Sequence, residues 1–127
     1  MPKAGQGEVW DCYLGPIRGR EQDGRRACLI VSVDQLGTGP GELAIIVPLT
    51  RTSRIPTEIK IDPPEGGLEA TSYALPYQVR AITRERLRRH RGNVSHATLS
   101  AVIANVHLLT RPPDPDSSPP SETPAAP

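Results

Sequence analysis

Short apolar runs separated by glycine, proline and polar residues cover most of the chain before Thr83. Residues 8–14 alternate, so that Trp10 and Cys12 share one face of a predicted strand. Residues 26–33 are apolar at nearly every position, which is typical of a strand buried on both faces. The breakers between the later runs predict further strands at 42–50, 58–62, 71–75 and 78–83.

Helical patterning is confined to the carboxyl-terminal third. Thr83 is expected to cap a short basic helix over residues 84–89, with Gly92 behind it. Ser95 is expected to cap a longer helix over residues 96–109, which carries an apolar stripe. Many short strands with helices only at the end predict a mainly β (α+β) fold, a small curved barrel with a helix packed on it.

The last residues differ sharply in composition from the rest. Residues 111–127 contain no large apolar side chain and many prolines, so we expect a disordered Pro-rich tail behind a domain of residues 1–110. Without the three acidic residues of this tail, the chain contains 15 basic and 11 acidic residues, a formal charge of +4. Thirteen of the basic residues are arginines. Arginine suits phosphate, although an arginine-favouring codon usage explains the bias equally well. The charge permits a nucleic-acid partner without requiring one.

The two cysteines and the absence of long apolar runs bear on metal binding and on the location of the protein in the cell. Cys12 and Cys28 lie in apolar strand patterns away from other ligand types, which favours buried reduced thiols over a metal site. Neither a metal nor a cofactor is expected. No run approaches the length of a signal segment or a membrane span, so we predict a cytoplasmic protein that does not bind membranes.

The second and third strands are predicted to place an arginine beside a threonine. If residues 26–33 and 42–50 form a hairpin centred near Thr38, the numbers of paired residues sum to about 76, so that Arg26 faces Thr50. Pro48 cannot donate to a ladder, which predicts an exposed edge or a bulge near the end of the third strand. An arginine fork and a threonine hydroxyl together suit a phosphate group.

Such a pair fits the cleavage of RNA, whose 2′-hydroxyl is a built-in nucleophile. The guanidinium can stabilise a phosphorane and help to protonate the leaving oxygen, but it is a poor general base because it stays protonated. The three histidines lie in the carboxyl-terminal third, far in sequence from both loops, and Glu21 is the best carboxylate by position. This route ends in a 2′,3′-cyclic phosphate and a 5′-hydroxyl.

Three segments carry a resemblance to a known family. Residues 19–27 (GREQDGRRA) and 47–50 (VPLT) resemble the G-x-E-Q-x-G-x-R-P and V-x-P-L-T motifs of the MazF/PemK toxins, and residues 78–80 (QVR) follow in the right order. Ala27 replaces the usual proline. Leu75 and Tyr77 stand where the PemK/Kid branch has an arginine and an aspartate, so the Arg/Thr scheme of the MazF branch fits better.

The resemblance implies an SH3-like barrel of the CcdB/PemK toxin type that forms a homodimer. It also implies a sequence-selective, metal-independent endoribonuclease that cleaves single-stranded RNA (mRNA) and is neutralised by an acidic antitoxin protein. Arg26 and Thr50 would be the catalytic residues. The RNA-binding residues would be Arg20, Glu21, Gln22, Thr52, Ser53, Tyr77 and Gln78.

Two other functions suit the same scaffold. One is a non-enzymatic toxin such as the CcdB-type inhibitors of gyrase, which rely on a carboxyl-terminal Trp-Gly-Ile segment. The single tryptophan here is Trp10, and the chain ends in prolines, which counts against this alternative. The other is a nucleic-acid-binding barrel that has lost catalysis, since a fold does not guarantee a function.

Overall fold

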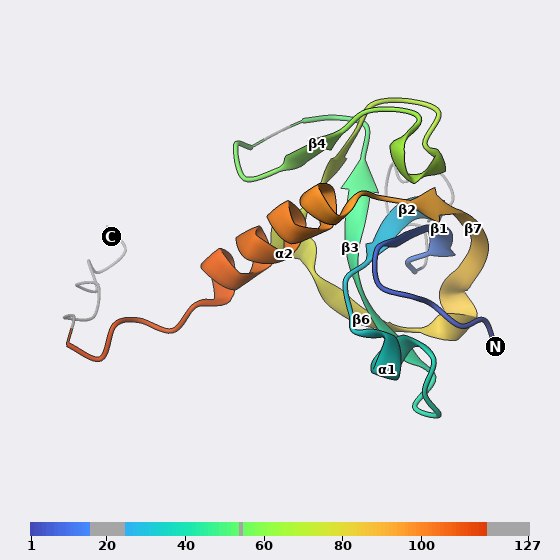
Figure 1. Ribbon diagram of the computed structural model, residues 1–127, viewed down its shortest axis with the longest axis horizontal. Coiled ribbons are helices and arrows are strands. Elements are labelled where there is room, and N and C mark those ends of the chain that lie inside the picture. The colour runs from blue at the N-terminus through green and yellow to red at the C-terminus, as the bar shows by residue number, and fades with distance from the viewer. Residues whose placement is uncertain (16–24, 54, 117–127) are drawn as a thin grey trace, which may run out of the picture.

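A curled antiparallel sheet with one long helix against its side forms the molecule (Figure 1). The computed structural model describes residues 1–15, 25–53 and 55–116. Within these residues the elements are β1 (Glu8–Tyr13), β2 (Arg25–Ile30), α1 (Asp34–Gly37), β3 (Leu43–Thr50), β4 (Ile59–Ile61), η1 (Glu65–Gly67), β5 (Ser72–Ala74), η2 (Pro76–Gln78), β6 (Arg80–Thr83), η3 (Arg84–Arg86), β7 (Leu87–Asn93) and α2 (His96–Thr110). The predicted mainly β fold with a carboxyl-terminal helix is confirmed.

The sheet runs β4-β5-β3-β2-β1-β7, and β6 pairs with β3 outside this path. The central strand β2 separates two apolar clusters, because its side chains alternate between the two faces of the sheet. Cys28 and Ile30 belong to one cluster, whereas Leu29 belongs to the other together with Val102 of α2. The near-continuous apolar run of β2 therefore has the two-sided burial that the sequence predicts.

The predicted register between β2 and β3 is confirmed. Cys28 pairs with Pro48 and Ile30 with Ile46, so that the paired numbers sum to 76. A short helix, α1, connects the two strands, which replaces the simple turn expected near Thr38. Instead of the exposed edge or bulge predicted near Pro48, β3 changes partner there: it pairs with β6 up to Ile46 and with β5 from Leu49 onward. A residue without an N–H group is tolerated where the strand changes neighbours.

The predicted basic helix over residues 84–89 is wrong. A 3₁₀ turn of three residues, capped by the Thr83 hydroxyl, is followed at once by β7, which pairs along β1 from Glu8 to Cys12. Pairing with β1 outweighs the helix propensity of the arginines, since tertiary context overrides weak local preferences. Gly92 also has a packing role there, because a Cβ atom would approach the amide nitrogen of Gly67 to 2.7 Å.

Arg84 is buried, which is unusual for an arginine. Its side chain is 3% exposed, and its guanidinium donates to the carbonyl oxygens of Pro2, Gly37 and Gly39. The same residue's backbone N–H donates to the Glu42 carbonyl at 2.8 Å. Arg84 therefore ties the amino-terminal segment and the region around α1 to the barrel.

The long helix agrees with its prediction. Ser95 caps α2, its hydroxyl accepting from the N–H of Thr98 at 3.1 Å. The Glu65 carboxylate accepts from the N–H of Ser95 at 2.8 Å. Burial raises the pKa of Glu65, but hydrogen bonds from Thr98 and Ser95 outweigh this effect and leave the pKa below its usual value. Beyond the buried Val102 the helix extends away from the barrel, where Leu108 and Leu109 are exposed (Figure 1).

The chain after α2 has no regular secondary structure as far as residue 116, and residues 111–116 are exposed. The predicted tail falls mostly on residues 117–127, which lie outside the described residues, so the domain boundary stays a prediction. In the described part of the chain, no helix is long and apolar enough to cross a membrane.

Candidate active site

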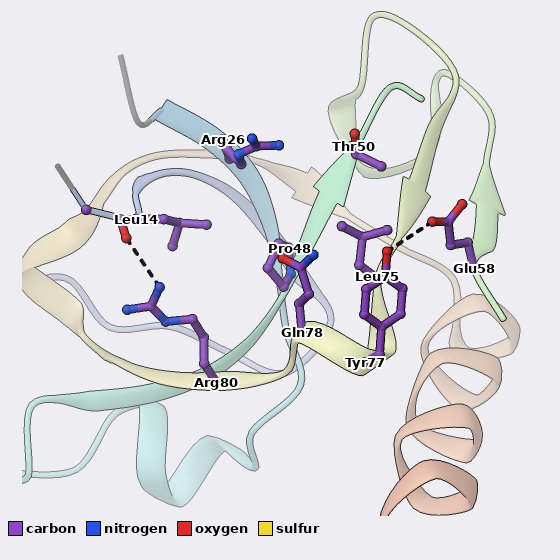
Figure 2. Close-up of a pocket in the computed structure, with 10 residues that line it drawn as sticks. Leu14, Arg26, Pro48, Thr50, Glu58, Leu75, Tyr77, Gln78 and Arg80 are labelled. Carbon is purple, nitrogen blue, oxygen red and sulfur yellow. Dashed lines mark hydrogen bonds between the residues drawn. The ribbon is translucent and has the colours of Figure 1, made fainter. Parts of the chain in front are cut away.

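A pocket of about 330 Å³ opens where the ends of β1, β2 and β3 meet η2 (Figure 2). Its lining is mostly polar on the η2 side and carries cationic groups on the β2 and β6 sides. The lining residues are Leu14, Gly15, Arg26, Pro48, Thr50, Glu58, Leu75, Tyr77, Gln78 and Arg80.

Arg26 stands near the start of β2 with an exposed side chain, and Figure 2 shows it extending toward the side where Thr50 lies. Its backbone is held by pairing with Cys12, whose thiol donates to the Arg26 carbonyl oxygen at 3.3 Å. Arg25 precedes Arg26 in the same strand, so the Arg25 side chain points to the opposite face of the sheet. The backbone of Arg26 is therefore held in the sheet, and its side chain lines the pocket.

Thr50 is the last residue of β3 and is half-buried. The pairs between β2 and β3 run from Ile30–Ile46 to Cys28–Pro48, and Arg26 and Thr50 lie two residues beyond the last of these pairs. Its hydroxyl oxygen accepts from the N–H of Thr52 at 3.4 Å, which leaves the hydroxyl hydrogen available for donation. The arginine and threonine that the sequence predicts as partners therefore line the same pocket.

Tyr77 and Glu58 form the far wall of the pocket. The Tyr77 hydroxyl donates to a carboxylate oxygen of Glu58 at 3.2 Å, as the dashed line in Figure 2 shows. Tyr77 lies in η2 and is 41% exposed. Glu58 precedes β4, and the sequence analysis did not single it out. A charged residue just before a short strand gives little reason to predict a functional site. The contact with Tyr77 joins residues 19 positions apart, so it could not be predicted from the local sequence.

Arg80 is the second cation of the pocket, and it was predicted only as part of the QVR motif. It lies in β6, and its guanidinium donates to the Leu14 carbonyl oxygen at 3.2 Å (Figure 2). Gln78 and Arg80 are two positions apart, so the strand-like spacing was the signal that could have placed both at one site. The pocket lining contains two arginines, Arg26 and Arg80, and one carboxylate, Glu58, so its net positive charge favours an anion.

The other predicted RNA-binding residues divide into two groups. Thr52 and Ser53 are exposed and lie beyond the pocket lining. Arg20, Glu21 and Gln22 lie outside the described residues. Trp10 is half-buried, packs on one apolar cluster and stacks on His90 with 5.4 Å between ring centroids.

The cysteine pair lies behind the site. Cys12 and Cys28 are free thiols and fully buried, as predicted. A hydrogen bond with Cys12, together with burial, raises the pKa of Cys28 far above its usual value, so this thiol stays protonated. Within the described residues, no group of three His, Cys, Asp or Glu side chains is arranged to hold a metal ion.

Comparison with known proteins defines the class. Residues 5–110 match the family model described as a PemK-like, MazF-like toxin of type II toxin–antitoxin systems. The chain therefore belongs to this toxin family, and the family resemblance read from the sequence is confirmed.

Two relatives and two solved structures support the assignment. Endoribonuclease MazF9 of Mycobacterium tuberculosis (strain ATCC 25618 / H37Rv) is 30% identical over 101 residues, 75% of this chain and 86% of the relative. Endoribonuclease EndoA of Bacillus subtilis (strain 168) is 33% identical over 85 residues, 65% of this chain and 72% of the relative. At the level of the family, the prediction of an enzyme of the endoribonuclease class is confirmed.

The solved structures agree on the fold. MazF from Deinococcus radiodurans superposes with a TM-score of 0.72 at 22% identity, covering 86% of this chain and 97% of that chain. An endoribonuclease in complex with its cognate antitoxin, from a mycobacterial species, has a TM-score of 0.69 at 23% identity, covering 91% of this chain and all of that chain. The curled sheet and carboxyl-terminal helix are thus shared with MazF structures.

Proposed function

We propose that this chain is a sequence-selective, metal-independent endoribonuclease that cleaves single-stranded RNA by attack of the 2′-hydroxyl on the adjacent phosphate. The observation that supports the proposal is that Arg26, near the start of β2, and Thr50, at the end of β3, line one pocket. A single strand suits this site because its bases can be splayed apart and its 2′-hydroxyl aligned with the scissile bond.

Each side chain has a task that matches its chemistry. The Arg26 guanidinium neutralises the charge that develops on the non-bridging oxygens of the phosphorane and donates a hydrogen bond to the leaving 5′-oxygen. As the bond from the 2′-oxygen to phosphorus forms and the bond from phosphorus to the 5′-oxygen breaks, the 2′-hydroxyl proton passes to water, and a proton from water reaches the 5′-oxygen. The Thr50 hydroxyl donates one hydrogen bond to the same phosphate and orients it. Arg80, across the pocket, binds a neighbouring phosphate and fixes the strand. Cleavage then leaves a 2′,3′-cyclic phosphate and a 5′-hydroxyl.

The partners follow from the family and from the surface. A toxin of a type II system is paired with an antitoxin, and an acidic antitoxin segment would present carboxylates to the same arginines that hold phosphates. The exposed Leu108 and Leu109 on α2 favour a homodimer that covers this part of the helix. We place the working protein in the cytoplasm, where its RNA substrate is made.

The decisive experiment digests a long single-stranded RNA with the purified chain in excess chelator. Mapped 5′ ends should fall after one short motif, and the fragments should carry 2′,3′-cyclic phosphates. A substrate with a single 2′-deoxy substitution at the scissile nucleotide should bind but stay intact, because it lacks the nucleophile. Cleavage of that substrate, or ends that carry 5′-phosphates, would show attack by water and refute the proposed reaction.

A further inference from the structure

Two guanidinium groups from the later part of the chain hold the end of β1 beside the pocket. The Arg86 guanidinium donates to the Tyr13 carbonyl oxygen at 3.2 Å. The Arg80 guanidinium donates to the next carbonyl oxygen, that of Leu14, at 3.2 Å, and both of these residues line the pocket (Figure 2). Arg86, in η3, is half-buried and lies outside that lining, so the phosphate chemistry described above gives it no task.

The position of Arg26 depends on this end of β1. Cys12 pairs with Arg26 across the two strands, and its thiol donates to the Arg26 carbonyl oxygen at 3.3 Å. The pairs of β2 with β3, in contrast, begin only at Cys28. In the part of the chain that the structure describes, β1 is therefore the only strand paired with the first two residues of β2, Arg25 and Arg26. A shift of the end of β1 would move the Arg26 backbone with it.

Arg86 is placed to prevent such a shift. The next residue, Leu87, is buried and pairs with Cys12 at the start of β7, so the backbone beside Arg86 is fixed by the core. A hydrogen bond from a charged donor is stronger than one between neutral groups. Strand ends without such contacts fray, because little free energy opposes their local opening. The contact of Arg86 with Tyr13 thus ties the end of β1 to β7.

We propose that Arg86 is a positioning residue: it holds the end of β1, and through Cys12 the backbone of Arg26, where the Arg26 guanidinium meets the scissile phosphate. This inference rests on the proposed RNA cleavage. A misplacement of about 1 Å in a group that stabilises the transition state can cost about 10²-fold in rate. Loss of Arg86 should therefore slow the chemical step, while the affinity for RNA, which depends on the whole pocket, changes little.

The test compares the chemical step with RNA binding in Arg86→Met and in the matched control Arg88→Met. Methionine keeps an unbranched stem and removes the charge and the donors. Arg88 is exposed and lies two residues further along, in β7, so the control removes the same charge. Single-turnover cleavage at saturating RNA should be roughly tenfold to hundredfold slower in Arg86→Met and nearly unchanged in Arg88→Met. Both should bind an RNA blocked by a 2′-O-methyl group at the scissile nucleotide as tightly as wild type does.

A double mutant shows whether Arg86 acts through Arg26. Residues that act as a unit are not additive, so Arg86→Met should cost no further rate once Arg26 is alanine. A further loss of about tenfold in the double mutant would show independent action and refute the proposal. Weaker binding in Arg86→Met with an unchanged rate would make Arg86 an ordinary RNA-binding charge and also refute it. If Arg86→Met does not fold, Arg86→Lys keeps the stem and charge, and should show a smaller loss of rate with the same absence of a further loss.

Nuclear magnetic resonance tests the same contact without cleavage. The backbone amide signal of Arg26 should shift in Arg86→Met and not in Arg88→Met, whereas that of Ile30, which pairs with Ile46, should stay in place in both. An unchanged Arg26 signal in Arg86→Met would refute the positioning role. If that signal depends on Arg86 but the wild-type chain cuts no RNA, the proposed function is refuted while the coupling of Arg86 to Arg26 stands.

Discussion

Replacing Arg26 by alanine isolates its contribution to catalysis from its contribution to the fold. The side chain is exposed, and the hydrogen bond from Cys12 is made to the Arg26 backbone carbonyl, so the substitution removes no contact of the core. The free energy of unfolding should change by less than about 0.5 kcal/mol, as for other exposed positions. The rate of RNA cleavage, in contrast, should fall steeply.

The size of that fall follows from what the guanidinium donates. Loss of one preorganised donor to a developing oxyanion costs about 10²–10³ in rate, and a guanidinium that combines two donors with a full charge belongs at the upper end, about 10³. Thr50→Ala removes one neutral hydrogen bond and should cost roughly tenfold or less. The larger loss should therefore be at Arg26.

Arg25→Ala is the matched control, because Arg25 is the neighbouring exposed residue of β2 and leaves the opposite face of the sheet. It removes the same charge without reaching the pocket. Single-turnover cleavage of a fluorescent RNA measures the chemical step, and urea unfolding at one protein concentration measures stability. An Arg26→Ala variant that retains a third of the wild-type rate, or an equal loss in Arg25→Ala, would refute the assignment of the site.

Three further outcomes follow from the structure. Arg84→Ala should lower the free energy of unfolding by about 3 kcal/mol, because it leaves buried carbonyl oxygens without the hydrogen bonds that the guanidinium donates. Arg88→Ala, at an exposed position, should change the free energy of unfolding by less than about 0.5 kcal/mol in the same urea titration. The folded-state pKa of Glu65 is lowered, so its ionised form stabilises the fold above the unfolded-state pKa and this contribution is lost as the pH falls. The stability difference between wild type and Glu65→Gln should accordingly be full near neutral pH and shrink as the pH falls through the lowered folded-state pKa of Glu65, as thermal melts at each pH would show. Deleting residues 112–127 should leave the melting temperature and the cleavage rate nearly unchanged, and a large fall in either would show that the segment docks on the domain.

Local pattern alone was enough for most of the sheet. The period-two alternation of residues 8–14 and the nearly continuous apolar run of residues 26–33 predict strands there, because side-chain direction depends on neighbouring residues, although β2 ends earlier than predicted, at Ile30. The β2–β3 register could also be derived, since two strands joined by a short connection have few ways to pair while keeping their apolar faces buried. The predicted register is found in the pairs Cys28–Pro48 and Ile30–Ile46, and Arg26 and Thr50 both line the pocket beyond them.

The order of strands further along the chain was decided by tertiary contacts. The basic run from Arg84 reads locally as a helix, yet residues 87–93 form a strand because β1 needs a second neighbour. Burial of Arg84 follows from the same arrangement, which brings it against carbonyls of Pro2, Gly37 and Gly39, all more than 40 positions away. Local helix or strand propensity contains no information about a contact between residues so far apart in the sequence.

The two halves of the site divide in the same way. The placement of Arg26 and Thr50 in one pocket could be predicted from the sequence, because the register of a single hairpin brings the start of β2 near the end of β3. The opposite side of the pocket, lined by Glu58, Tyr77 and Arg80, comes from three separate segments that become neighbours only because β3 changes partner near Pro48 and the chain folds back along it. A side chain's neighbours across a pocket depend on long-range packing, and no periodicity within a single segment encodes them.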